Sequence, residues 1–203
     1  MSKPFVVIVA GPNGSGKTTL TTLLRQRGLD FGEYVNPDDI AVGLKGSYDA
    51  RVREAQAIAD EMRDECIAEG RSFSFETVMS HHSKIDIMLK ARDAGFEVTL
   101  FFVATESSSI NVARVASRVE LGGHEVADDK IKARYVRTIG LLPEAVRAAH
   151  RSYIFDNTKT NADGSSAIAA VMEIENGVGG LRVVNRLAKS PEWLRPALMT
   201  LGL

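Results

Sequence analysis

Two apolar runs rich in β-branched residues stand out along the chain, at residues 5–10 (FVVIVA) and 96–104 (FEVTLFFVA). Runs of this length and composition are typical of strands that are buried on both faces of a parallel sheet. Shorter apolar or alternating segments predict three further strands, at residues 33–36, 72–77 and 152–156. The hydrophobic pattern therefore predicts a parallel sheet of about five strands.

Segments with helical periodicity separate these strands. The glycines that follow them, such as Gly28, Gly70 and Gly95, are typical helix ends. Strands that alternate with helices at this spacing favour an α/β fold with helices on both faces of the sheet. The helices are predicted at residues 18–27, 50–69, 82–94 and 108–142, the last being interrupted at Gly122-Gly123.

The C-terminal part of the chain, about residues 165–203, has a different pattern. Residues 167–176 and 180–185 predict a small terminal hairpin, and a short helix is expected to begin near Pro191. The sequence contains no repeat, low-complexity tract or linker. We therefore expect one domain over residues 1–203, with this part as a small extension.

Charge and cysteine content bear on which partners the protein binds and in which cellular compartment it works. A formal net charge of -1 and a pI near 6.4 give no global field for nucleic acid or an anionic membrane. Cys66 is the only cysteine, which excludes an intramolecular disulfide and a cysteine-based zinc site. No apolar stretch approaches the roughly 18 residues of a membrane span. We expect a cytoplasmic protein that acts on a small molecule.

The segment after the first strand matches the phosphate-loop pattern G-x-x-x-x-G-K-[ST] at residues 11–18 (GPNGSGKT). Its glycines allow backbone N–H groups to curl around phosphate oxygens, and Lys17 supplies a positive charge to the β- and γ-phosphates. The Thr18 hydroxyl is a candidate Mg²⁺ ligand. A strand before the motif and a helix after it are the required context. The predicted ATP-binding residues are Gly11, Pro12, Asn13, Gly14, Ser15, Gly16, Lys17, Thr18 and Thr19.

Two acidic positions follow predicted strands and are therefore expected at the same sheet edge as the phosphate loop. After the second strand comes Asn36-Pro-Asp38-Asp39, in which a carboxylate is a candidate proton acceptor for an attacking hydroxyl. The alternative is that Asp38 or Asp39 only caps a helix beginning near Ile40. At the end of the third strand, the Glu76 carboxylate is a candidate ligand for substrate hydroxyls, and the alternative is a merely polar strand end.

Arginines cluster in the segment from about 108 to 142. Arg114 and Arg118 share one face of a predicted helix, and Arg134 and Arg137 follow the Gly122-Gly123 break. Two arginine-bearing helices joined by glycines are typical of a lid that closes over a transferring phosphoryl group. The alternative is a solvated charged face. Further on, Asp156-Asn157 ends the fifth strand, where either contact with adenine or a plain turn is expected.

The order of these motifs resembles the zeta-toxin family of P-loop kinases, in particular its short bacterial branch. The resemblance extends over roughly residues 5–157 and rests on the strings GPNGSGKTT, VNPDDIA, SFSFETVMS, ARVASRVELGGHEV and IKARYVR. It implies a kinase that uses ATP and Mg²⁺, with Asp38 as general base and Glu76 as the residue that positions substrate. Asn36 and Thr77 are grouped with Glu76 as substrate-binding candidates. The lid arginines implied are Arg118 and Arg134, with Arg114 as a further candidate.

The best-known activity of that family is phosphorylation of the sugar 3'-hydroxyl of UDP-N-acetylglucosamine, in toxins restrained by antitoxins. Two departures bear on this substrate: the longer toxins have an Asp-x-Asp-type string where this chain has Asn36-Pro-Asp38, and this chain is shorter. A nucleoside, an antibiotic or a nucleic-acid 5'-end remains an alternative acceptor. The sequence also contains no conventional Walker B aspartate, and a nucleotide-gated regulatory module remains an alternative of a different class.

Overall fold

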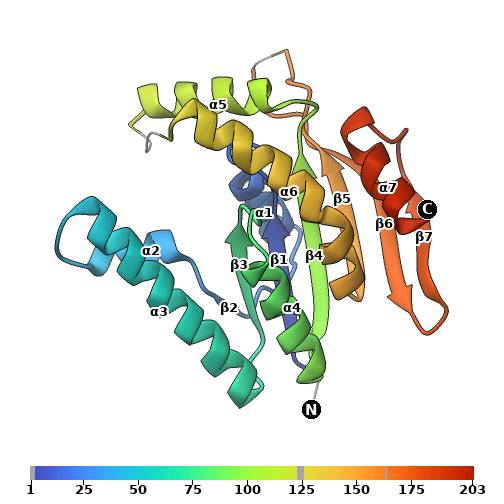
Figure 1. Cartoon of the computed structure of the whole chain (residues 1–203), viewed down its shortest axis with the longest axis horizontal. Coiled ribbons are helices and arrows are strands. Elements are labelled where there is room, and N and C mark those ends of the chain that lie inside the picture. The colour runs from blue at the N-terminus through green and yellow to red at the C-terminus, as the bar shows by residue number, and fades with distance from the viewer. Residues whose placement is uncertain (1–2, 123–125, 163) are drawn as a thin grey trace.

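The computed structural model describes residues 3–122, 126–162 and 164–203. Within them, all strands belong to one seven-stranded sheet of order β2-β3-β1-β4-β5-β6-β7 (Figure 1). The five predicted strands are confirmed, and they pair in parallel with β1 at the centre between β3 and β4. The strands are β1 (Phe5–Ala10), β2 (Glu33–Tyr34), β3 (Phe73–Thr77), β4 (Glu97–Ala104), β5 (Arg151–Asp156), β6 (Ala169–Gly177) and β7 (Gly180–Arg186).

The predicted C-terminal hairpin exists, but it is part of the main sheet. β6 pairs antiparallel with β5, and β7 pairs antiparallel with β6. Val171, Met172 and Ile174 of β6 join the main hydrophobic core. The hairpin thus covers the otherwise unpaired edge of β5. The prediction of about five strands is therefore corrected to seven, because a segment interpreted as an appendage completes the sheet.

The helices lie close to their predicted places, with differences at the ends. Helix α6 continues past the predicted end at residue 142 to Ala148, through Pro143. A short 3-10 turn precedes the last helix, near the predicted start at Pro191. The helices are α1 (Lys17–Gln26), α2 (Pro37–Gly43), α3 (Tyr48–Glu69), α4 (Ser83–Asp93), α5 (Ser108–Glu120), α6 (Asp128–Ala148), η1 (Glu192–Leu194) and α7 (Arg195–Leu201).

Helices cover both faces of the sheet, as predicted. On one face, α4, α6 and α7 pack over the main core, whereas α1 lies on the opposite face (Figure 1). The core under α1 is smaller and includes Leu20 of the helix together with Val9 and Val103 of the sheet. No helix among the described residues has the length and apolarity to cross a bilayer.

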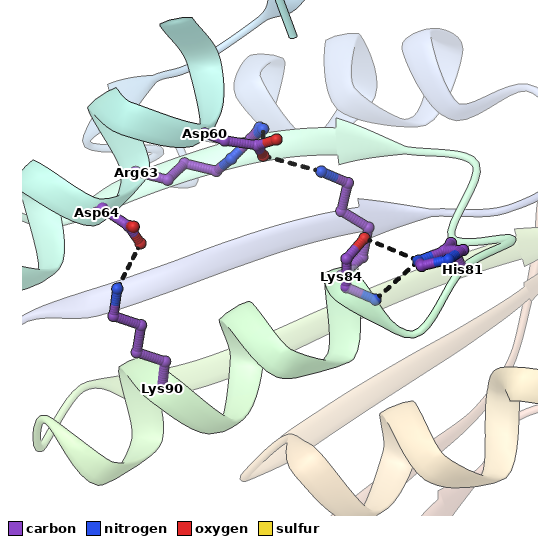
Figure 2. A network of polar contacts seen from close by, with 7 residues as sticks. Asp60, Arg63, Asp64, His81, Lys84 and Lys90 are labelled. Atoms are coloured by element: carbon purple, nitrogen blue, oxygen red, sulfur yellow. Dashed lines mark hydrogen bonds and ion pairs between the residues drawn. The ribbon is translucent and has the colours of Figure 1, made fainter. Parts of the chain in front are cut away.

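Helices α2 and α3, with the residues between them, form an arm (residues 37–69) on the β2 side of the sheet (Figure 1). The fully buried Arg63 of α3 lies 4.9 Å from the ring centroid of Phe75 in β3. Two ion pairs join α3 to α4, Asp60–Lys84 at 3.0 Å and Asp64–Lys90 at 2.7 Å (Figure 2). Polar contacts thus contribute to the attachment of the arm to the rest of the fold.

Candidate functional site

The predicted phosphate loop connects the end of β1 with the start of α1. Gly16 is the residue before the helix and has φ of 97°, a left-handed conformation that glycine adopts without strain. No side chain caps the first turn of α1. The N–H groups at the start of α1 and the positive end of its dipole are therefore oriented to receive an anion.

Two buried asparagines hold this loop from outside. Asn111 of α5 donates from its amide to the backbone oxygen of Asn13, and Asn157 after β5 donates to the backbone oxygen of Ser15 at 2.9 Å. Both asparagine side chains are fully buried. Asn157 therefore supports the phosphate loop, a role that neither sequence interpretation of Asp156-Asn157 included.

The glycines also allow the loop to pack closely against the strands. A Cβ atom at Gly11 would lie 2.0 Å from the Val103 carbonyl oxygen, and one at Gly16 would lie 2.4 Å from the Asn157 amide nitrogen. Real Cβ atoms do not approach other atoms so closely. These two glycines are therefore required by the packing of the loop, in addition to any approach of phosphate.

Lys17 lies at the centre of the site. Its ammonium group donates to the backbone oxygens of Gly11 and Pro12, each at 3.0 Å. Burial lowers the pKa of Lys17 to about 8; Arg118 and Arg134 act in the same direction, and the carboxylates of Glu76 and Asp38 oppose it. The four predicted catalytic and substrate-binding side chains are thus close enough to one lysine to change its pKa.

Glu76 is the second-last residue of β3, which lies directly beside β1, and Val9 is its partner in register. One carboxylate oxygen accepts a hydrogen bond from the Thr18 hydroxyl and the other accepts one from the Tyr34 hydroxyl, each at 3.0 Å. Burial, with Glu76 nearby, raises the pKa of Tyr34 above its usual value. Glu76 therefore contacts the Thr18 hydroxyl, which is predicted to bind Mg²⁺. Because this acidic residue is a glutamate, the absence of a conventional Walker B aspartate from the sequence does not reveal its place beside Thr18.

Helix α2 begins earlier than predicted, at Pro37, and Asn36 is its N-cap. The Asn36 side chain accepts a hydrogen bond from the backbone N–H of Asp38 at 3.1 Å. The alternative that Asp38 or Asp39 caps this helix is therefore wrong, because the amide of Asn36 already fills that position. Asp38 and Asp39 are exposed in the first turn, and Asp38 lies toward Lys17.

The remaining predicted site residues lie in different surroundings. The Thr77 hydroxyl accepts a hydrogen bond from the backbone N–H of Met79, and its carbonyl oxygen accepts one from Gly11. Arg114 donates to the backbone oxygen of Asn157 at 2.8 Å, and one of its terminal nitrogens is buried without a partner. Thr19 is exposed in the first turn of α1. Gly123 and His124 of the predicted lid lie outside the described residues.

Comparison with known proteins identifies similar chains. No family model matches the sequence. An uncharacterized protein from Haemophilus influenzae is 31% identical over 131 residues, which are 64% of this chain and 91% of that protein.

Among solved structures, a chain from the AvrRxo1-ORF1:AvrRxo1-ORF2 complex with ATP is 17% identical, with a TM-score of 0.60 over 90% of this chain. A chain from the PezAT chromosomal toxin-antitoxin system of Streptococcus pneumoniae is 14% identical, with a TM-score of 0.55 over 82% of this chain and 72% of that one. A candidate kinase from Chloroflexus aurantiacus is 22% identical, with a TM-score of 0.51 over 68% of this chain and 78% of that one.

At these identities, the structural likeness is one of fold. It shows that the chain shares its α/β fold, with a mostly parallel sheet between helices, with these solved structures. The chain spans 61% of the length of the AvrRxo1 chain that it matches. Function has to be argued from the site itself.

Proposed function

This chain belongs to the same family as the Haemophilus influenzae protein, and we propose that it is an ATP-dependent kinase that transfers the γ-phosphoryl group to a small-molecule hydroxyl. The observation that supports this most is the convergence of Asp38, Glu76, Arg118 and Arg134 on Lys17. A phosphate loop alone is common to many nucleotide-binding proteins. A carboxylate and two arginines around its lysine are the further groups that phosphoryl transfer needs.

The phosphates of ATP would lie in the loop from Gly11 to Thr18, against the start of α1. The hydroxyl of Thr18 and the carboxylate of Glu76 are hard oxygen ligands, already in contact, and they fit an Mg²⁺ ion held directly or through water. When bound, Mg²⁺ supplies charge neutralisation on the β- and γ-phosphates. We therefore propose that Glu76 supports the metal in addition to the predicted contact with substrate.

Asp38 is the proposed general base. It is exposed, it lies in the first turn of α2, and it lies toward Lys17. From there, its carboxylate accepts the proton of the acceptor hydroxyl as that oxygen attacks the γ-phosphorus. Arg118 and Arg134, on the two helices of the proposed lid, would neutralise charge on the phosphoryl oxygens.

The acceptor and the partner are proposed from the family resemblance. UDP-N-acetylglucosamine or another nucleotide sugar is the first acceptor to test. The PezAT system pairs a toxin with an antitoxin, which supports an antitoxin as a possible partner of this chain. A different acceptor, or a regulatory ATP-binding module, remains the competing hypothesis. The regulatory module has no need of a base at the position of Asp38.

The proposal is tested by incubating the purified protein with γ-labelled ATP, Mg²⁺ and a panel of hydroxyl acceptors headed by UDP-N-acetylglucosamine. We expect label on one class of acceptor and loss of that label with Asp38→Ala. Binding of ATP without transfer to any acceptor in a broad panel would support the regulatory module instead. Omitting Mg²⁺, or adding a chelator, should abolish transfer in the wild type.

A further inference from the structure

A pocket of about 170 Å³ lies between α2 and the start of α3. Three of its lining residues come from each helix, at positions i, i+3 and i+4, so that one face of α2 lies opposite one face of α3. Asp38, the proposed general base, forms part of its wall. The lining residues are Asp38, Ala41 and Val42 of α2 and Tyr48, Arg51 and Val52 of α3.

Arg51 is the cationic residue of this pocket. Its Nε atom is buried and has no hydrogen-bond partner, and its guanidinium forms no ion pair with another described residue. Three turns further along α3, the Nε atom of Arg63 is likewise buried without a partner, but a terminal nitrogen of Arg63 pairs with Asp60 at 2.5 Å (Figure 2). A buried guanidinium N–H without an acceptor is costly. The Arg51 side chain therefore lacks the anionic partner that Arg63 has.

From this arrangement we infer that the acceptor carries a carboxylate or phosphate group that pairs with Arg51 while its hydroxyl faces Asp38. The inference rests on the proposed kinase function. Arginine suits such a group because its planar fork donates two parallel hydrogen bonds to a carboxylate or phosphate. Val42 and Val52 add apolar side chains to the lining of the same pocket.

The size of the pocket limits which part of the acceptor enters it. Pockets that enclose a complete drug-sized ligand measure about 300–1,000 Å³. This pocket is smaller, and it suits the reacting end of the acceptor, with the hydroxyl and the anionic group close together. The acceptor oxygen forms a bond to the γ-phosphorus, the bond from that phosphorus to the β–γ bridging oxygen breaks, ADP leaves, and the hydroxyl proton passes to Asp38.

An anion site at Arg51 distinguishes anionic acceptors from neutral and cationic ones. It favours hydroxy acids, sugar phosphates and nucleotide sugars, and it disfavours neutral sugars, nucleosides and cationic antibiotics. The test uses matched pairs that differ in the anionic group: glucose with glucose 6-phosphate, N-acetylglucosamine with UDP-N-acetylglucosamine, and uridine with UMP. Transfer from γ-labelled ATP is measured for the wild type, Arg51→Gln and the control Arg53→Gln, whose arginine is exposed on the same helix.

We expect the charged member of at least one pair to be the better acceptor. Arg51→Gln should raise its KM by about ten- to hundredfold without changing the KM for ATP, as expected for the loss of a hydrogen bond to a charged group. Arg53→Gln should leave both constants unchanged. Equal use of charged and neutral members, or equal behaviour of the two variants, would overturn the inference and leave the kinase function standing.

Calorimetry separates failure of this inference from failure of the kinase proposal. Protein saturated with a non-hydrolysable ATP analogue is titrated with the charged member of each pair. Binding that is lost in Arg51→Gln and kept in Arg53→Gln, with no transfer in the labelling assay, would support the anion site and contradict the kinase function. If no charged member binds the wild type, the anion site is overturned.

Discussion

The phosphate loop and the α2–α3 arm are built in different ways. The loop consists of backbone that is fixed on several sides: Gly11 bonds to β3, and the buried amides of Asn111 and Asn157 hold its carbonyl groups. The arm presents side chains instead, with Asp38 and Arg51 around its pocket and ion pairs to α4. The proposed donor site is thus rigid backbone, whereas the proposed acceptor site depends on side chains.

This difference has a consequence for specificity. A backbone cradle recognises phosphate groups in any nucleotide, and it changes only when the loop itself changes. Side chains on a two-helix arm can be replaced one at a time without disturbing the sheet. We therefore expect substitutions in the loop to affect ATP binding and folding together, and substitution of Arg51 in the arm to affect binding of the acceptor without affecting binding of ATP.

Within the phosphate loop, the largest expected effect is on Lys17. Replacing Lys17 with Met removes the charge at the centre of the site, and transfer should fall by at least about 100- to 1,000-fold. Lys45→Met, at an exposed position in the arm, is the matched control. Initial rates of transfer from labelled ATP measure the effect. Retention of most activity in Lys17→Met would contradict the proposed place of the phosphates.

The second prediction concerns the support of the loop. Asn157→Ala removes a buried amide from the Ser15 carbonyl, and we expect the free energy of unfolding to fall by about 1–3 kcal/mol, with weaker ATP binding. Urea denaturation and nucleotide titration measure the two effects. Gln56→Ala, at an exposed position of α3, should change neither. An unaltered affinity for ATP in Asn157→Ala would show that the loop keeps its shape without this support.

The third prediction is a pH dependence. The pKa of Lys17 is about 8 in the folded protein, below its ordinary value of 10.5. Phosphate favours the protonated lysine, so affinity for ATP should fall as pH rises above about 8, by at most about tenfold per pH unit. Titrations between pH 7 and pH 10 are expected to show this fall in the wild type but not in Lys17→Met.

The free energy of unfolding should also depend on the protonation of Lys17, but it should rise with pH over the range in which the affinity for ATP falls. In the absence of nucleotide, between pH 8 and 10.5, the unfolded chain keeps the Lys17 proton while the folded protein loses it. The contribution of Lys17 to the free energy of unfolding therefore rises with pH over this range. The difference between the wild type and Lys17→Met in urea denaturation, measured at several pH values, isolates this contribution. A difference independent of pH would contradict the lowered pKa.

The smallest expected effect is on the attachment of the arm. Lys84 is 18% exposed in its pair with Asp60, whereas Lys90 and Asp64 are 53% and 57% exposed. A double-mutant cycle should give a coupling of about 0.2–1 kcal/mol for exposed pairs, and the Asp60–Lys84 pair should lie at the upper end. Denaturation of the single and double variants provides the cycle. A larger coupling for Asp64–Lys90 would contradict this ranking.

The features that could be predicted from the sequence are those with a local pattern. The phosphate loop was predictable because its glycines, Lys17 and Thr18 have fixed spacing, and the buried strand β1 precedes them. The five parallel strands were predictable, two from continuous apolar runs and three from shorter apolar or alternating segments. The β6–β7 hairpin was located, but its pairing with β5 depends on which sheet edge is free, and this is a property of the whole fold.

The contacts of the site were less predictable. Asn111 and Asn157 lie far from the loop in sequence, and a buried amide has no local pattern that distinguishes it from a turn residue. An aspartate cap was one of two interpretations of Asp38-Asp39, and the sequence does not exclude it because both aspartates and Asn36 suit the N-cap position. The unpartnered Nε atom of Arg51 depends on the packing of α2 against α3, which the helical periodicity does not specify.

The most direct test of the kinase proposal compares two neighbouring aspartates. Asp38 and Asp39 are both exposed in the first turn of α2, but Asp38 lines the pocket and its charge acts on the pKa of Lys17, whereas the charge of Asp39 acts on the pKa of Tyr34. Single-turnover transfer of the labelled γ-phosphoryl group should fall by about 100- to 10,000-fold in Asp38→Asn, with ATP affinity unchanged, and stay near the wild-type rate in Asp39→Asn. Equal rates in the two variants would contradict the assignment of Asp38 as the base.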